Sequence, residues 1–130
     1  MSGVKLTDIV EKMNLKNLTP EVDITEREVL VPDVNRPALQ LAGFFDHFDL
    51  NRVQIIGNVE CAYLETLAEE KRVEIYQKLL EHKVPCIIFS NELQPDESFI
   101  EIAQKNDIPV FGTCKKTSSF MGELIRWLNV

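Results

Sequence analysis

VPCIIFSNELQPDESFIEIAQKNDIPVFGT, residues 84–113, contains two short apolar runs separated by one amphipathic segment. The runs at Pro85–Ser90 and Pro109–Thr113 are typical of buried strands. A helix that opens at Pro95 or Asp96 connects them. Its expected apolar side consists of Phe99, Ile102 and Ala103. Two apolar strands joined by a helical crossover predict a parallel sheet whose faces are both covered.

The same alternation continues on both sides of this unit. Upstream, Val53–Ile56 predicts a buried strand ended by Gly57, and residues 58–81 predict helix in one or two pieces. Downstream, Ser118 or Ser119 caps a last helix. Its expected inward side chains are Met121, Leu124, Ile125 and Leu128. We therefore predict a layered α/β fold with a mostly parallel sheet of about four strands and helices on its faces.

The amino-terminal third has weaker signals. Thr7 predicts the cap of a first helix, and residues 14–21 predict a polar connection ending at Pro20. Glu28–Val31 predicts a short strand, which Pro32 stops because proline has no amide donor. These short elements do not predict how the chain before residue 31 packs on the sheet.

Residues 31–48, VPDVNRPALQLAGFFDHF, predict a strand exit, a capped helix and an aromatic turn. Asn35 is a good helix cap, and Pro37 suits the first helical turn. Gly43 can end the helix in a left-handed conformation. We expect the three phenylalanines that follow to hold the helix to the sheet. They are Phe44, Phe45 and Phe48.

Composition excludes several classes of function. The chain has 130 residues, 45% of them hydrophobic, which suits one compact domain. Its formal net charge of -7 disfavours nucleic acid and anionic membranes as partners. The three cysteines form neither a disulfide framework nor a zinc motif, so we expect buried free thiols. The first residues contain no apolar segment of signal-peptide length, which predicts a cytoplasmic protein.

The glycines argue against phosphoryl transfer by this chain. A phosphate-binding loop needs clustered glycines followed by a lysine and a hydroxyl residue. The five glycines here are widely separated, and no such loop occurs. We expect no catalytic, cofactor or metal site within these residues. The chain ends in helix-forming sequence after Trp127, which favours a junction to a further domain.

Loops after parallel strands are where such sheets bind ligands. The loop TCKKTSS, residues 113–119, offers hydroxyls, lysines and a helix start for a nucleotide or sugar phosphate. Its candidate ligand residues are Thr113, Lys115, Lys116, Thr117, Ser118 and Ser119. Ordinary helix capping beside a solvated basic turn is the alternative. A small thiol enzyme that uses Cys114 is a further alternative.

Two other constellations have simpler interpretations. We expect Asp33 and Arg36 to form a local ion pair that fixes the turn before the helix. Alternatively, Arg36 is exposed and binds a partner. Asp46 and His47 are expected to form a surface hydrogen-bonding pair.

Four segments, in this order and spacing, resemble the amino-terminal domain of HPr kinase/phosphorylase. They are VNRPALQLAGFFDHF (34–48), RVQIIGNVECAYLETL (52–67), VPCIIFSNEL (84–93) and PVFGTCKKTSSFMGELIRWL (109–128). Ala38 departs from the family's usual glycine, and His47 replaces a usual aromatic residue. The resemblance implies a fold similar to the amino-terminal, UDP-binding domain of UDP-muramoyl peptide ligases.

The resemblance also implies a function. The parent enzyme would phosphorylate a serine of the phosphocarrier protein HPr with ATP or pyrophosphate and Mg, and reverse this by phosphorolysis, in carbon catabolite control. It would be a homo-oligomer, expected to be a hexamer, with its chemistry in a second domain. This chain would then be a non-catalytic regulatory and oligomerisation domain, and a stand-alone nucleotide or sugar-phosphate sensor is the alternative. The residues expected at a subunit or interdomain surface are Arg36, Phe44, Phe45 and His47.

Overall fold

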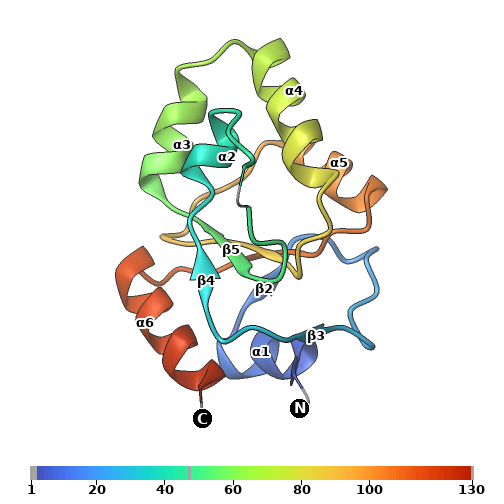
Figure 1. Ribbon diagram of the computed structural model, residues 1–130, viewed down its shortest axis with the longest axis vertical. Helices are drawn as coiled ribbons and strands as arrows, with labels where there is room; N and C mark the ends of the chain where they lie inside the picture. Colours follow the sequence, from blue (N-terminus) through green and yellow to red (C-terminus); the bar gives the residue numbers. More distant parts are fainter. Residues whose placement is uncertain (1–2, 47, 130) are drawn as a thin grey trace.

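The computed structural model describes residues 3–46 and 48–129. Its centre is a five-stranded sheet in the order β2-β7-β6-β5-β4 (Figure 1). β4 to β7 run parallel to one another, and the edge strand β2 is antiparallel to β7. The strands are β2 (Lys16–Asn17), β4 (Val34–Asn35), β5 (Val53–Ile56), β6 (Ile87–Phe89) and β7 (Val110–Gly112). The predicted mostly parallel sheet is therefore confirmed.

In the part of the chain that the structure describes, six helices pack on the two faces of this sheet. On one side lie α2 to α5, and on the other lie α1 and α6 (Figure 1). Their bounds are α1 (Leu6–Lys12), α2 (Ala38–Leu41), α3 (Asn58–Glu65), α4 (Glu69–Leu80), α5 (Glu97–Lys105) and α6 (Thr117–Leu128). The helical stretch expected over residues 58–81 is thus divided into two helices, α3 and α4.

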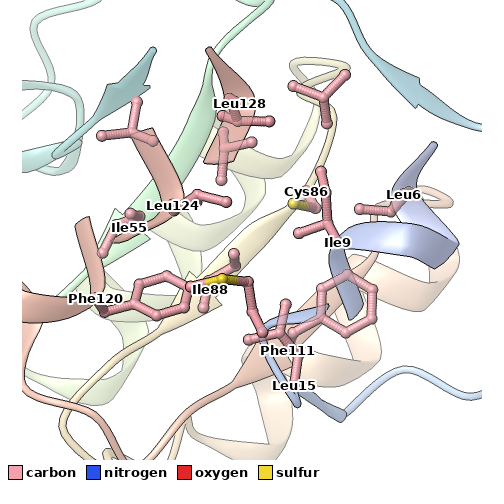
Figure 2. Packing of buried hydrophobic residues seen from close by; sticks show 14 residues of the cluster. Leu6, Ile9, Leu15, Ile55, Cys86, Ile88, Phe111, Phe120, Leu124 and Leu128 are labelled. Atoms are coloured by element: carbon pink, nitrogen blue, oxygen red, sulfur yellow. The ribbon is translucent and has the colours of Figure 1, made fainter. Parts of the chain in front are cut away.

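Alternation along the strands creates two cores. Ile55 and Ile88 point toward α1 and α6, where they meet Phe120 and Leu124 (Figure 2). Their neighbours Ile56, Ile87 and Phe89 point to the other face, toward α4 and α5. Successive side chains of a strand point to opposite faces, so strands that are apolar throughout need both helical layers.

A small two-stranded sheet lies outside the main one. β1 (Val4–Lys5) pairs antiparallel with β3 (Glu28–Val29). The strand expected at residues 28–31 therefore exists, but it does not belong to the parallel sheet. The first parallel strand is β4, which lies a few residues further along.

Four sequence predictions about local structure were wrong in detail. α1 begins at Leu6 with Lys5 as its N-cap, so Thr7 lies inside the helix and does not cap it. Residues 14–21 include the edge strand β2, because the Leu18 amide donates to the Val110 carbonyl (2.9 Å) and the Thr19 hydroxyl accepts from the Val110 amide (2.9 Å). Asn35 lies in β4 rather than capping α2, and its side-chain amide donates to Gln54 Oε1 at 2.7 Å. The last helix begins at Thr117, ahead of the expected caps Ser118 and Ser119. Gly43 does end α2 with a left-handed φ of 100°, as predicted.

Candidate functional site

The carboxyl ends of the parallel strands gather a compact polar cluster. Gly57 follows β5, Ser90 follows β6, and the loop after β7 leads into α6 at Thr117. The hydroxyls of Ser90 and Thr117 are hydrogen-bonded at 2.6 Å, and Ser90 Oγ also donates to the Ile56 carbonyl at 3.2 Å. The Ser90 side chain is buried. These bonds join the ends of β5 and β6 to the start of α6.

Arg36 and Glu60 form an ion pair with two hydrogen bonds in this cluster. The Arg36 guanidinium donates twice to the Glu60 carboxylate, from Nε to Oε2 at 3.0 Å and from Nη2 to Oε1 at 2.5 Å. The Glu60 side chain is only 2% exposed and that of Arg36 is 31% exposed. Glu60 Oε1 also accepts from the Gly57 amide at 2.8 Å, which satisfies a free donor at the start of α3. This pair ties the segment after β4 to α3.

The prediction of an ion pair between Asp33 and Arg36 was wrong. Asp33 instead lies 3.3 Å from Arg52, while Arg36 pairs with Glu60 in α3. A carboxylate that is buried and already fixed by a backbone amide is a stronger partner than an exposed one nearby in sequence. Arg36 is therefore engaged within the fold.

Gly57 is crowded by both sides of this cluster. A methyl group at its α-carbon would lie 2.7 Å from Thr117 Oγ1 and 2.8 Å from Arg36 Nη2. Glycine is required here by the close approach of these two side chains rather than by its backbone angles. The sequence predicts Gly57 as the end of a strand and the start of a loop, but no local pattern reveals this crowding.

The loop at residues 113–119 is held by one contact of its own and by several contacts with neighbouring elements. Thr113 is buried and its hydroxyl accepts from the Lys115 amide at 3.2 Å, while Lys115 Nζ pairs with Glu123 at 2.6 Å. Thr117 is engaged with Ser90. Lys116, Ser118 and Ser119 are exposed. The structure thus divides the six candidate ligand residues into three with internal partners and three on the surface.

An adjoining loop supports this arrangement. Asn91 and Glu92 have left-handed φ angles of 60° and 58°, which non-glycine residues adopt rarely. Their amides donate to the carbonyls of Lys115 (2.7 Å) and Thr113 (2.9 Å). The strained turn after β6 is therefore fixed by the loop after β7, a pairing that no local sequence pattern reveals.

Four exposed apolar side chains belong to α2, to the residues just after it, and to α3. Leu39 in α2 is 62% exposed, and Val59 in α3 is 68% exposed. Phe44, just after α2, and Tyr63, one turn after Val59, are also exposed. We call these four residues the α2–α3 face. α2 and α3 pack against each other, near the end of the molecule opposite the end of α6 (Figure 1).

The residues expected at an interface take different positions. Phe44 belongs to the α2–α3 face, whereas Phe45 stacks on His82 with ring centroids 4.6 Å apart, and Phe48 meets both rings edge-on. Phe45 and Phe48 therefore hold the turn to the end of α4, within the core cluster on that face of the sheet, whereas Phe44, which was expected to help anchor the helix to the sheet, is exposed. His47, and with it the pair with Asp46, lies outside the described residues. Sequence reasoning missed Val59 and Tyr63, because apolar residues at helical spacing usually indicate core.

The cysteines differ in environment. Burial, with the charges of Glu60 and Glu65, raises the pKa of the Cys61 thiol to about 11, and burial raises that of Cys86 to about 12. Cys114 is exposed, in contrast to the buried thiol expected there. Within residues 3–46 and 48–129, no three side chains of the metal-binding types lie together as a metal site. Over the same residues, no helix has the length and apolar character needed to cross a bilayer.

Comparisons with known proteins give a consistent result. The family model described as "HPr Serine kinase N terminus" matches residues 4–128. The chain is 53% identical over 130 residues to an HPr kinase/phosphorylase of Lachnoclostridium phytofermentans, and 40% identical over 121 residues to one of Caldicellulosiruptor bescii. These alignments include 100% and 93% of this chain but only 42% and 39% of the two relatives.

A solved structure of another protein has a similar fold. It contains the CBS and DRTGG domains of the regulatory region of Clostridium perfringens pyrophosphatase, complexed with the activator diadenosine tetraphosphate. The TM-score is 0.67 at 21% identity, over 96% of this chain and 47% of that one. At this identity the similarity concerns the fold alone.

Proposed function

The chain belongs to the family of HPr serine kinase amino-terminal domains, and from this premise we propose that it is a non-catalytic regulatory and assembly domain of an HPr kinase/phosphorylase. The parent would phosphorylate HPr on serine with ATP or pyrophosphate and Mg, reverse the reaction by phosphorolysis, and act in the cytoplasm as a homo-oligomer. Residues 1–130 would form one domain, and the chemistry would lie in the longer remaining part of the parent. The chain spans about two fifths of the relatives that it matches, which supports a division of the parent into this domain and a longer catalytic part.

The polar cluster supports the non-catalytic part of the proposal. At the strand ends, where open α/β sheets usually bind substrates, the main charged groups satisfy one another. Arg36 is bound by Glu60, and Lys115 by Glu123. Such internal pairing stabilises a scaffold and leaves few groups for transition-state charge.

The α2–α3 face is the observation that supports the assembly part. Large apolar side chains that are exposed together on adjoining helices are typical of interaction surfaces. The end of α6, which would lead to the catalytic domain, lies at the other end of the molecule (Figure 1). We therefore place a different subunit of the parent, rather than the catalytic domain of the same chain, against this face.

Sedimentation of the full-length parent tests the proposal. In the Val59→Ser, Tyr63→Ser variant we expect smaller species than in the wild type, together with altered control of HPr phosphorylation. Leu30→Ser is the matched control, because Leu30 is 64% exposed but lies outside the α2–α3 face. Each exposed site should change the unfolding free energy by only about 0.5 kcal/mol. An unchanged species distribution together with unchanged control would refute the assembly role.

A second candidate function is the sensing of a phosphorylated metabolite at residues 113–119. Lys116, Ser118 and Ser119 face solvent at the start of α6, where a helix favours anions. The solved structure of similar fold is a regulatory region with a bound nucleotide activator, so nucleotides are the first ligands to test. A ligand at 100 times its Kd should add about 2.7 kcal/mol of stability. A thermal-shift series with nucleotides and sugar phosphates that gives no change would remove this candidate.

A further inference from the structure

A groove with a volume of about 380 Å³ lies at the amino-terminal ends of the parallel strands. Its apolar lining comes from the segments just before β5, β6 and β7 and just after β3, namely Leu50, Val84, Pro85, Ile108 and Leu30. Open α/β sheets bind small ligands at the carboxyl ends of their strands, where this chain has its polar cluster. A groove at the amino-terminal ends is therefore a candidate for a structural contact, and none of the functions proposed above uses it.

Two exposed leucines line this groove. Leu30 is 64% exposed and Leu50 is 40% exposed, whereas Val84 and Ile108 are buried. One exposed leucine is ordinary on a protein surface, but two that line the same groove form an apolar patch. We call this feature the Leu30–Leu50 groove. An occupant that covers the two leucines removes apolar area from water, which is favourable.

The charged side chains of the groove have partners within the fold. Those that line it are Arg27, Lys83, Glu28 and Asp107, two cations and two carboxylates. Arg27 Nη2 donates to the Asp107 carboxylate at 2.5 Å, and Lys83 Nζ donates to the Asn106 carbonyl at 2.5 Å. Because both cations are engaged and the four charges cancel, the groove suits an apolar occupant better than an anion.

The end of the last helix is fixed close to this groove. α6 ends at Leu128, and the side-chain amide of Asn129 donates to the Pro32 carbonyl at 3.2 Å. Figure 1 shows the end of α6 beside the segment that connects β3 to β4. Leu30 precedes Pro32 by two positions, so their α-carbons are at most about 7 Å apart. A chain that continues beyond residue 130 therefore begins within a few residues' reach of the groove.

We propose that the Leu30–Leu50 groove binds the segment that directly follows residue 130 in the parent enzyme, through apolar side chains of that segment. This inference rests on the proposed function, because the segment exists only in a parent whose catalytic part follows this domain. The chain aligns with 42% and 39% of two relatives, which leaves the longer part of such a parent to follow it. A cavity of about 150 Å³ holds benzene, so the groove has room for about two large side chains.

The size of the groove favours a tethered segment over a second copy of the chain. A stable interface between separate proteins buries about 800 Å² on each partner, far more than two leucines and a proline provide. A segment joined to the same domain has an effective concentration in the millimolar range, so a small apolar contact is sufficient. The contact lies within one chain, and its loss leaves the number of subunits unchanged.

Photocrosslinking in the full-length parent tests this contact. Asn51 is exposed and lines the groove, so the substitution Asn51→p-benzoylphenylalanine places a photoreactive group there and keeps both leucines. The same group at Lys71, on the exposed surface of α4, is the matched control. A denaturing gel separates crosslinks within one chain from crosslinks between subunits, and mass spectrometry identifies the residues that are joined.

We expect crosslinks within one chain, from position 51 to residues directly after 130, and none of these from position 71. Leu30→Asp should lower their yield about tenfold, because a carboxylate then replaces an apolar wall of the groove. Leu39→Asp should leave the yield unchanged, since Leu39 is 62% exposed, close to the 64% of Leu30, but belongs to the α2–α3 face. Both leucines are largely exposed, so both variants should fold.

Three outcomes would overturn this proposal. They are the absence of crosslinks from position 51, crosslinks that join position 51 to another subunit, and crosslinks to residues elsewhere in the same chain. Any of these combined with smaller species in the Val59→Ser, Tyr63→Ser variant would refute the role of the groove and keep the assembly role. The expected crosslinks combined with unchanged sedimentation and unchanged control of HPr phosphorylation in that variant would keep the groove and refute the assembly role.

Discussion

Replacement of Glu60 by leucine would leave the Arg36 guanidinium and the Gly57 amide without their shared acceptor. The carboxylate receives three hydrogen bonds, two from Arg36 and one from Gly57, and its side chain is 2% exposed. Breaking a buried ion pair costs about 3–5 kcal/mol. Arg36 is partly exposed and can regain water, so we expect the lower end, about 3 kcal/mol.

The reverse change should cost more. In Arg36→Leu the buried carboxylate of Glu60 keeps only the Gly57 amide, so we expect a loss of about 4 kcal/mol. The double variant should lose clearly less than the sum of the two, because neither charge is then left unpaired. For a chain of this length, about 3 kcal/mol corresponds to a fall in Tm of about 10 °C.

Urea unfolding followed by circular dichroism measures all three variants. Glu74→Gln is the matched control, since Glu74 pairs with Lys71 and Lys78 on the surface and should change stability by less than about 0.5 kcal/mol. A Glu60→Leu protein within about 0.5 kcal/mol of the wild type would refute the reasoning. So would strict additivity in the double variant.

Three further predictions concern single sites. Gly57→Ala should lower the free energy of unfolding in urea by about 1–3 kcal/mol, because the new methyl group meets atoms less than 3 Å away. The control Gly122→Ala, where α6 has open space, should raise the free energy of unfolding by about 0.5–1 kcal/mol. Equal effects of the two substitutions would contradict the crowding at Gly57. Iodoacetamide at pH 8 should label the exposed Cys114 first. Cys61 should react roughly a hundredfold more slowly than an ordinary thiol, because the pKa of the Cys61 thiol is raised from 9.0 to about 11. A Cys114 that reacts much faster than a free thiol would instead support the thiol-enzyme alternative. Burial and the hydrogen bond to Asp96 raise the pKa of Tyr76 well above its ordinary value of 10.0, so the contribution of Tyr76 to the folding free energy is complete below pH 10 and declines above it. A Tyr76→Phe protein should therefore lose less stability than the wild type as the pH rises above about 10, and equal slopes there would contradict this.

The parallel half of the fold was predictable because its signals are local. Apolar runs such as Val53–Ile56 and Pro109–Thr113 have the length and composition of buried strands, and the amphipathic segments between them have helical spacing. The amino-terminal third was not, because its strands are two residues long and depend on distant partners. β2 exists only because β7 lies beside it, and no pattern around Lys16 indicates that neighbour.

The candidate sites show the same limit. The loop at residues 113–119 was placed correctly at the sheet edge, but the partners of its side chains were not foreseen. Glu123 and Ser90 come from other elements and engage Lys115 and Thr117. The aromatic turn was located, yet which phenylalanine stays exposed depends on His82, 37 positions after Phe45 in the chain. Pairing across elements, rather than local propensity, decides these features.

Accessibility of one engineered thiol tests the assembly role most directly. Val59→Cys, in a background with Cys114→Ser, would be treated with a bulky maleimide in the 130-residue chain and in the full-length parent. We predict free reaction in the isolated chain and about tenfold or stronger protection in the parent, with Lys71→Cys on exposed α4 reacting equally in both. Equal rates at position 59 in the two proteins would contradict the claim that the α2–α3 face is covered by another subunit.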